Sequence, residues 1–176
     1  MIYYEQNGLR IRDLEPADVD VFVAAERAQG WQGSTPDKLN ERVAQRDAGE
    51  CVLLAAEMNG EHAGYVSVYW NASAGAYAGM NIPEIVDFNV LVKLRRRGIG
   101  GKMMDVCEQI AAERCDRVCL GVGLYRDYGS AQRMYVKRGY VPDGSGVWWQ
   151  DKNIDPYTDC CNDDDLVLYL SKELKK

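Results

Sequence analysis

The stretch from Ile85 to Cys115 constrains the fold most, because a strand, a glycine-rich turn and a long helix follow one another there without a gap. Residues 85–92 are apolar and rich in β-branched side chains, which is typical of a strand buried in a sheet. After Gly98, apolar side chains recur at helical spacing and predict one buried stripe. They are Ile99, Met103, Val106, Cys107 and Ile110. The chain is therefore expected to build a sheet with helices packed against it.

Arginines and glycines fill the turn between this strand and this helix. In order they are Arg95, Arg96, Arg97, Gly98, Ile99, Gly100 and Gly101. A positive side chain at a helix N-terminus opposes the helix dipole by roughly 0.3–1 kcal/mol. An anion bound to the N-terminal N–H groups would offset that cost, and glycines would let the backbone approach it. The other interpretation is a solvated turn, and the local sequence leaves the two about even.

Hydrophobic periodicity and turn residues predict the remaining elements. Strands are expected at residues 9–14, 51–58, 61–70, 117–123, 147–150 and 166–170, and helices at 16–28, 34–49 and 128–138. The Asn59-Gly60 pair predicts a hairpin turn, and Pro142 is expected to break the strand that begins at Tyr140. Residues 117–123 are expected to return parallel to 85–92. The segment 71–83 is expected to be a mobile loop that borders a site.

Length and charge limit the classes of function. The 176 residues fit a single domain, residues 1–176, with an acidic loop insertion at 151–165. A net charge of -6 argues against nucleic acid as a partner and favours encounters with cations. The N-terminus lacks the features of a secretory signal, and no apolar stretch is long enough to cross a bilayer. A cytoplasmic protein without a membrane partner is expected.

The six cysteines show no paired C-x-x-C spacing, and the single histidine, His62, cannot complete a zinc site with them. No bound metal is expected, and the thiols are expected to be reduced. Cys160 and Cys161 lie in the acidic loop, where redox activity or soft-metal binding is the alternative to two ordinary exposed thiols.

Two motifs carry a resemblance to a known family. The first has the spacing [QR]-x-x-G-x-[GA] directly after a strand, and the second has the spacing A-x-x-x-Y-x-x-x-G-[FY] on a helix. The first is made by Arg95, Gly98 and Gly100, and the second by Ala131, Tyr135, Gly139 and Tyr140. In this order and at this distance, the motifs resemble the GNAT superfamily of acetyl-CoA-dependent N-acetyltransferases over almost the whole chain.

The resemblance implies an α/β (α+β) fold: a mixed, mostly antiparallel sheet with a central parallel strand pair splayed at the cofactor site, flanked by about four helices. It also implies acetyl-CoA as co-substrate, with the pyrophosphate cradled by N–H groups of the turn and the thioester carbonyl polarised by a strand N–H. The acetyl group would lie between residues 88–90 and 118–123. The implied coenzyme-binding residues are Phe88, Asn89, Val90, Arg95, Arg96, Arg97, Gly98, Ile99, Gly100, Gly101, Tyr128 and Ala131.

The resemblance also implies catalytic roles. Tyr135 matches the general acid that protonates the departing thiolate, and its alternative is a buried helix aromatic. An alkylamine is mostly protonated at neutral pH, so a base is expected, and Glu84 and Asp87 are the candidates at the start of the central strand. Tyr128 stands where many members have an asparagine that contacts coenzyme A. Gly123 has no side chain where other members have a glutamate.

The expected reaction is direct acetyl transfer to a primary amine, because no cysteine falls in either motif. The acidic loop favours a small cationic acceptor, and a protein amine is the next candidate. Trp31, on a loop between two helices, is a candidate for contact with the acceptor, or else fills a gap in the core. A non-catalytic acyl-CoA-binding sensor or scaffold is the competing class of function. The oligomeric state stays open, with a homodimer as one option.

Overall fold

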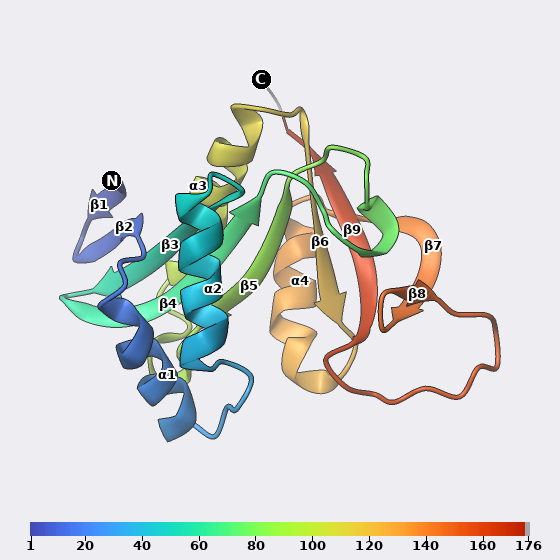
Figure 1. Ribbon diagram of the computed structural model, residues 1–176, viewed down its shortest axis with the longest axis horizontal. Coiled ribbons are helices and arrows are strands. Elements are labelled where there is room, and N and C mark those ends of the chain that lie inside the picture. Colours follow the sequence, from blue (N-terminus) through green and yellow to red (C-terminus); the bar gives the residue numbers. More distant parts are fainter. Residues whose placement is uncertain (175–176) are drawn as a thin grey trace. The chain divides into compact units, whose positions relative to one another are not determined.

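A computed structural model describes residues 1–174, and it divides into two compact units (Figure 1). The first unit comprises Met1–Tyr69 and Val86–Gln109. The second comprises Trp70–Ile85 and the described part of Ile110–Lys176. The expectation of one domain over residues 1–176 stays a prediction.

The first unit is built on antiparallel strands in the order β1-β2-β3-β4-β5. Their bounds are β1 Ile2–Gln6, β2 Leu9–Asp13, β3 Cys51–Met58, β4 Glu61–Tyr69 and β5 Glu84–Val90. The pairs β1/β2, β2/β3 and β3/β4 are antiparallel, and β3/β4 is the hairpin predicted at Asn59-Gly60. Just past β5, Leu91 N–H donates to the Ala63 carbonyl at 2.8 Å.

Helices α1 Asp18–Ala28 and α2 Pro36–Asp47 belong to the first unit, as does most of α3 Ile99–Ala112. Figure 1 shows α1 and α2 in front of the strands of this unit. Their apolar faces bury Phe22 and Leu39 against Leu53 of β3 in one core cluster. Thr35 caps α2 by accepting from Lys38 N–H at 3.2 Å, and Pro36 takes the first helical position, where it loses no hydrogen bond.

The second unit continues from the start of β5 in the order β5-β6-β9-β7-β8, with one helix, α4 Gly129–Lys137. Its strands are β6 Arg117–Gly123, β7 Val141–Trp149, β8 Lys152–Asn153 and β9 Leu166–Glu173. Only β5 and β6 are registered as parallel among the described strands, at Glu84 and Cys119. This confirms the predicted class: a mixed, mostly antiparallel sheet with one parallel pair and four helices. Short 3₁₀ turns lie at Gly75–Tyr77 (η1), Val92–Leu94 (η2) and Arg126–Tyr128 (η3).

Strand β1 is absent from the elements predicted from sequence, although its signal is present. Asn7 and Gly8 adopt φ of 51° and 78°, nearly the same as 52° and 80° at the correctly predicted turn of Asn59 and Gly60. Such paired positive φ values are what a two-residue hairpin turn requires. The same dipeptide rule therefore predicts both hairpins.

The second unit contains more strand structure than its sequence predicts. Strand β7 runs through Pro142, which pairs with Leu170 of β9, whereas β8 on the other side of β7 pairs with Trp148 and Trp149. Pro142 therefore has a partner strand on one side, as at a sheet edge, where proline is tolerated. The short strand β8 lies inside the expected acidic loop. In the segment 71–83, Tyr77 and Ile82 are buried in a cluster with Tyr169, and the mobility of this segment stays a prediction.

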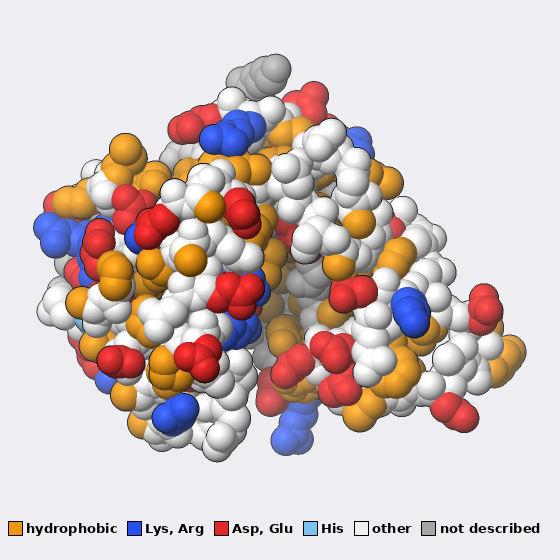
Figure 2. Space-filling model, viewed as in Figure 1, with side chains coloured by type: hydrophobic (Ala, Val, Ile, Leu, Met, Phe, Trp, Pro, Cys, Tyr) orange, Lys and Arg blue, Asp and Glu red, His pale blue; other side chains and the backbone are white. Residues whose placement is uncertain are grey.

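No helix among residues 1–174 combines the length and apolar composition needed to cross a membrane. Acidic and basic side chains are interspersed over the face shown in Figure 2.

Candidate active site

The turn between β5 and α3 is braced by its first arginine. Arg95 Nε donates to the Val90 carbonyl at 2.9 Å, and its guanidinium lies 5.1 Å from the centre of the Trp31 ring. Gly98 has φ of 81°, a left-handed conformation that favours glycine. Arg95 and Gly98 therefore fix the shape of the turn. Trp31 is half-buried and packs against Arg95 of this turn, so it does not fill a gap in the core.

Arg96 and Arg97 have a different role from Arg95. Both are exposed, and the ion pairs found among residues 1–174 include neither of them. They flank the N-terminus of α3, where a helix leaves its first N–H groups without carbonyl partners of its own. Two guanidinium groups and a helix N-terminus together form a positive surface suited to a phosphate or pyrophosphate.

Alternate side chains of β5 face different elements. A Cβ added at Gly100 would lie 3.3 Å from Phe88 Cζ and 3.6 Å from Val90 Cγ2, so these two side chains face the first turn of α3. Asn89, between them, points to α1, where its Nδ2 donates to Glu26 Oε1 at 2.5 Å. The strand thus separates the α3 side from the α1 side, as alternation along a strand requires.

Asp87 and Glu84, the two carboxylates proposed as bases, have different surroundings. Asp87 pairs with Lys38 and with Arg42, each at 2.9 Å, and has φ of 53° in the left-handed region. Glu84 is half-buried at the start of β5, in register with Cys119. Burial, and then the negative charge of Glu84, raise the pKa of the Cys119 thiol. Of the two carboxylates, Asp87 is thus the one whose charge is balanced by two ion pairs, with Lys38 and Arg42.

Tyr135 lies within the second unit on α4, where it is 5% exposed. Its ring centre is 5.7 Å from that of Tyr140, the last residue of the helix motif. Ala131 lies one turn earlier on α4, half-buried. The motif residues therefore pack together around the end of this helix, and the tyrosine is withdrawn from bulk water.

Gly123 and Tyr128, the two departures from the family pattern, lie against each other. A Cβ added at Gly123 would lie 2.4 Å from Tyr128 Cε2. The hydroxyl of Tyr128 donates to Asp164 at 2.8 Å, and burial together with this carboxylate raises the pKa of the phenol. Tyr125 donates to the same oxygen at 2.6 Å. Asp164 thus anchors the acidic loop to the residues before α4, a link that the sequence spacing does not reveal.

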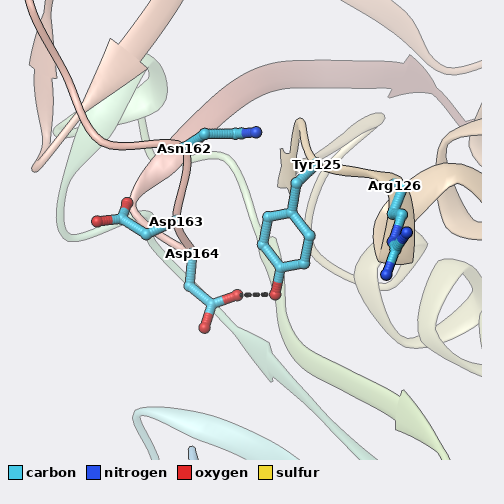
Figure 3. A pocket seen from close by; sticks show the side chains of 5 residues that line it. All are labelled: Tyr125, Arg126, Asn162, Asp163 and Asp164. Atoms are coloured by element: carbon cyan, nitrogen blue, oxygen red, sulfur yellow. Dashed lines mark hydrogen bonds between the residues drawn. The ribbon is translucent and has the colours of Figure 1, made fainter.

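A pocket of about 500 Å³ opens beside this anchor (Figure 3). Its lining residues are Tyr125, Arg126, Asn162, Asp163 and Asp164. The two carboxylates lie on one side of the Tyr125 ring and the Arg126 side chain on the other (Figure 3). In the same loop, Asp163 raises the pKa of the Cys161 thiol, which disfavours the reactive thiolate form.

A second polar cluster lies at the base of α1. Ligand atoms of Asp18, Glu57 and His62 lie within 4.8 Å of one another, as in some metal sites. Arg12 contacts both carboxylates, with Nη1 2.6 Å from Asp18 Oδ2 and Nε 2.9 Å from Glu57 Oε1. Arg12 therefore balances the negative charge of these two carboxylates.

Glu26 was not singled out from the sequence, yet it is 2% exposed and contacts Asn89. A signal was available: Val19, Phe22 and Val23 form the buried stripe of α1, and position 26 continues that stripe with a carboxylate. An acidic residue in the apolar stripe of a helix is a departure that sequence alone can flag.

The chain matches the model of the Acetyltransferase (GNAT) family over residues 19–140. It belongs to this family. No curated protein compared with the chain matches it. Membership makes the protein a GNAT-type acetyltransferase with acetyl-CoA as co-substrate.

Solved structures of this family share the fold at low sequence identity. An acetyltransferase from Salmonella typhimurium that modifies the N-terminal serine of ribosomal protein L7/L12 is 12% identical, with a TM-score of 0.71 and coverage of 99% of this chain and 100% of that one. Ard1 from Thermoplasma volcanium is 18% identical, with a TM-score of 0.69 and coverage of 96% and 99%. The putative acetyltransferase yncA from Salmonella typhimurium, solved with acetyl-CoA, is 16% identical, with a TM-score of 0.67 and coverage of 97% and 96%.

Proposed function

We propose that this acetyltransferase moves the acetyl group of acetyl-CoA directly to a primary amine, with Tyr135 as general acid. The observation that carries the proposal is the context of the two motifs. Arg96 and Arg97 precede the N-terminus of α3, after β5 and the η2 turn, and Tyr135 is buried near the end of α4. The resemblance assigns coenzyme binding to arginines at such a helix N-terminus and the general-acid role to a tyrosine on such a helix.

In this mechanism the amine nitrogen attacks the thioester carbonyl, a C–N bond forms and the C–S bond breaks. The thiolate takes the proton of the Tyr135 hydroxyl, and the tyrosine regains a proton as the acetylated amine loses one. N–H groups of β5 near Phe88 and Val90 stabilise the charge on the carbonyl oxygen. No cysteine is required as a nucleophile, and burial raises the pKa of both the Cys51 and Cys119 thiols.

Glu84 is the better candidate for the base that removes the amine proton. Asp87 is held in ion pairs by Lys38 and Arg42, so its two carboxylate oxygens already have partners. The turn residues 95–101, with Asn89, Tyr128 and Ala131, are proposed to bind coenzyme A. Trp31, braced by Arg95, is proposed to border the acceptor.

The acceptor is proposed to be a protein amine or a small cationic amine. The relative from Salmonella typhimurium that modifies a ribosomal protein N-terminus supports the first, and the acidic residues 151–165 support the second. A cytoplasmic location and the absence of a nucleic-acid partner also stay proposals.

Replacement of Tyr135 by phenylalanine tests the acid role. We expect kcat to fall roughly 100-fold, while calorimetric affinity for acetyl-CoA stays the same. The matched control is Tyr157→Phe, because Tyr157 is fully exposed. If Tyr135→Phe leaves kcat unchanged, Tyr135 is not the acid. If the parent binds acetyl-CoA but acetylates none of a broad amine panel, the protein is a sensor or scaffold instead.

A further inference from the structure

Cys160 and Cys161 are exposed thiols on adjacent residues of the acidic loop, and neither forms a disulfide. The direct-transfer mechanism uses neither of them. Cysteine is among the residue types most often buried, so two exposed thiols side by side are a departure from ordinary packing. The other cysteines are buried or partly buried: Cys51, Cys107, Cys115 and Cys119. The pair in the loop is therefore the part of the cysteine content that packing does not explain.

The two adjacent cysteines are better placed to share a metal ion than to form a disulfide with each other. Consecutive Cα atoms are about 3.8 Å apart across a trans peptide bond, and the peptide bonds of residues 1–174 are trans. Disulfides usually join Cα atoms about 4.4–6.8 Å apart, with sulfur atoms about 2 Å from each other. A tetrahedral zinc ion holds each sulfur at about 2.3 Å and so leaves the two sulfur atoms about 3.8 Å apart. Shared binding of an ion therefore avoids the strain of an internal disulfide.

An oxygen ligand lies beside the two thiols. The Cys161 thiol is hydrogen-bonded to the Asp163 carboxylate, and Cys160 is near enough to act on the same thiol through its charge. Asp163 Oδ1 also accepts from the Asp165 N–H at 3.1 Å, which orients the carboxylate within a turn. Two thiolates and one carboxylate oxygen are ligands that zinc accepts, with water in the fourth position.

The loop is anchored directly after these residues. Asp164 Oδ1 accepts from the hydroxyls of Tyr125 at 2.6 Å and Tyr128 at 2.8 Å. Asp163 lines the pocket beside this anchor, where Figure 3 shows its carboxylate on the same side of the Tyr125 ring as Asp164. A ligand on an anchored segment loses less conformational entropy on binding than one on a free loop. The exposed thiols need only turn toward a carboxylate that is already held in place.

We propose that Cys160, Cys161 and Asp163 form a binding site for a divalent cation that prefers sulfur ligands, such as zinc. The ion displaces one proton from each thiol and binds both thiolates, so each ion that binds releases two protons. The Asp163 carboxylate is the third ligand, and a water molecule is the fourth. The inference goes beyond the proposed function and does not depend on it, because acetyl transfer requires none of these three side chains.

Titration of the full-length protein with zinc chloride, under a phosphine reductant that keeps the thiols reduced, tests the site. We expect calorimetry to give one ion per chain, and cadmium chloride to produce the ultraviolet absorption of cadmium–thiolate bonds. Cys160→Ser/Cys161→Ser should lower the zinc affinity at least about 100-fold and abolish the cadmium absorption. Cys115→Ser is the matched control, because Cys115 is a partly exposed cysteine outside the loop, and it should bind zinc as the parent does.

Replacement of Asp163 by asparagine tests the carboxylate separately. The new side chain keeps an oxygen that accepts from the Asp165 N–H but loses the charged ligand, so the zinc affinity should fall about 10-fold. Asp159→Asn is the matched control, since it removes the same charge from an exposed position of the loop. Equal losses in the two variants would show that Asp163 acts through its charge alone, and would overturn its assignment as a ligand.

Three further results would overturn the site. The first is a parent protein without saturable zinc binding. The second is binding that persists in Cys160→Ser/Cys161→Ser and disappears in His62→Gln, which would place the ion in the cluster at the base of α1. The third is half an ion per chain together with a dimer in light scattering, which would show that two loops share the ion through four thiolates. Binding is measured without acetyl-CoA, so failure of the proposed acetyl transfer leaves each of these results readable.

Discussion

Gly123 and Tyr128 show how two single residues that depart from a family pattern depend on each other. Each departure removes a functional group of the family pattern: Gly123 offers no carboxylate and Tyr128 no amide. In the structure the Tyr128 ring fills the space that any side chain at position 123 would need. The Tyr128 ring therefore fits because residue 123 is a glycine. The Tyr128 hydroxyl in turn donates a hydrogen bond to Asp164.

Substitution of Gly123 by alanine should lower the free energy of unfolding by about 1–3 kcal/mol, because its Cβ would overlap the Tyr128 ring. Adding Tyr128→Ala should remove most of that penalty, so that a double-mutant cycle in urea gives a favourable coupling energy. Gly129→Ala is the matched control, since no atom lies within 4 Å of a Cβ there. Additive effects of the Gly123 and Tyr128 substitutions would contradict this account.

At the scale of elements, β5 is shaped by its contacts with the helices. Asp87 interrupts the strand with a left-handed φ of 53°, and α2 holds it there through Lys38 and Arg42. The periodicity of residues 85–92 predicts the strand but carries no information on this kink, since the kink depends on Lys38 and Arg42, which lie 49 and 45 residues earlier. Strand identity is local, whereas strand shape depends on tertiary ion pairs.

Removing the Asp87 side chain should therefore act on stability. Asp87→Ala should lower the free energy of unfolding by about 1–3 kcal/mol, because two half-buried cations lose their partner. Glu84→Gln should lower kcat with little change in stability, if Glu84 is the base. Urea unfolding and steady-state kinetics on the same two variants provide the measurement. Loss of kcat in Asp87→Ala without loss of stability would instead make Asp87 the base.

At the scale of the whole molecule, stability in acid depends on the network at the base of α1. Burial raises the pKa of Asp18, and hydrogen bonds from Arg12, His62 and the Glu15 N–H outweigh it, lowering the pKa to about 2. The network joins β2, β3, β4 and α1 through one carboxylate that is 5% exposed. Its loss is expected to affect global unfolding and not one loop.

The sign of the pH dependence follows from the lowered pKa of Asp18. Its contribution is fully present above the ordinary carboxyl pKa of 3.8 and is lost as pH falls toward 2. Asp18→Asn should therefore reduce stability at neutral pH by up to about 2 kcal/mol and flatten the slope between pH 4 and 2. Asp20→Asn, exposed on the same helix, is the control. Equal slopes for parent and Asp18→Asn in urea titrations would contradict the assignment.

The sequence by itself determined the family and most of the elements. Arg95, Gly98 and Gly100 after a strand, and Ala131 and Tyr135 on a helix, are local patterns whose spacing survives in the linear chain. Hydrophobic periods likewise located β3 and β6 at their observed bounds. Short-range backbone geometry controls these features, so they can be predicted without knowledge of the tertiary packing.

Only the tertiary structure decided how the residues of the candidate site are used. It placed the Arg95 guanidinium over the Trp31 ring, gave Asp87 two cations, and buried Glu26 beside Asn89 and Tyr65. Each result depends on side chains distant in sequence, whose approach is fixed by the packing of helices on the sheet. Desolvation and charge pairing set the chemistry of a carboxylate, and neither exists until the chain has folded.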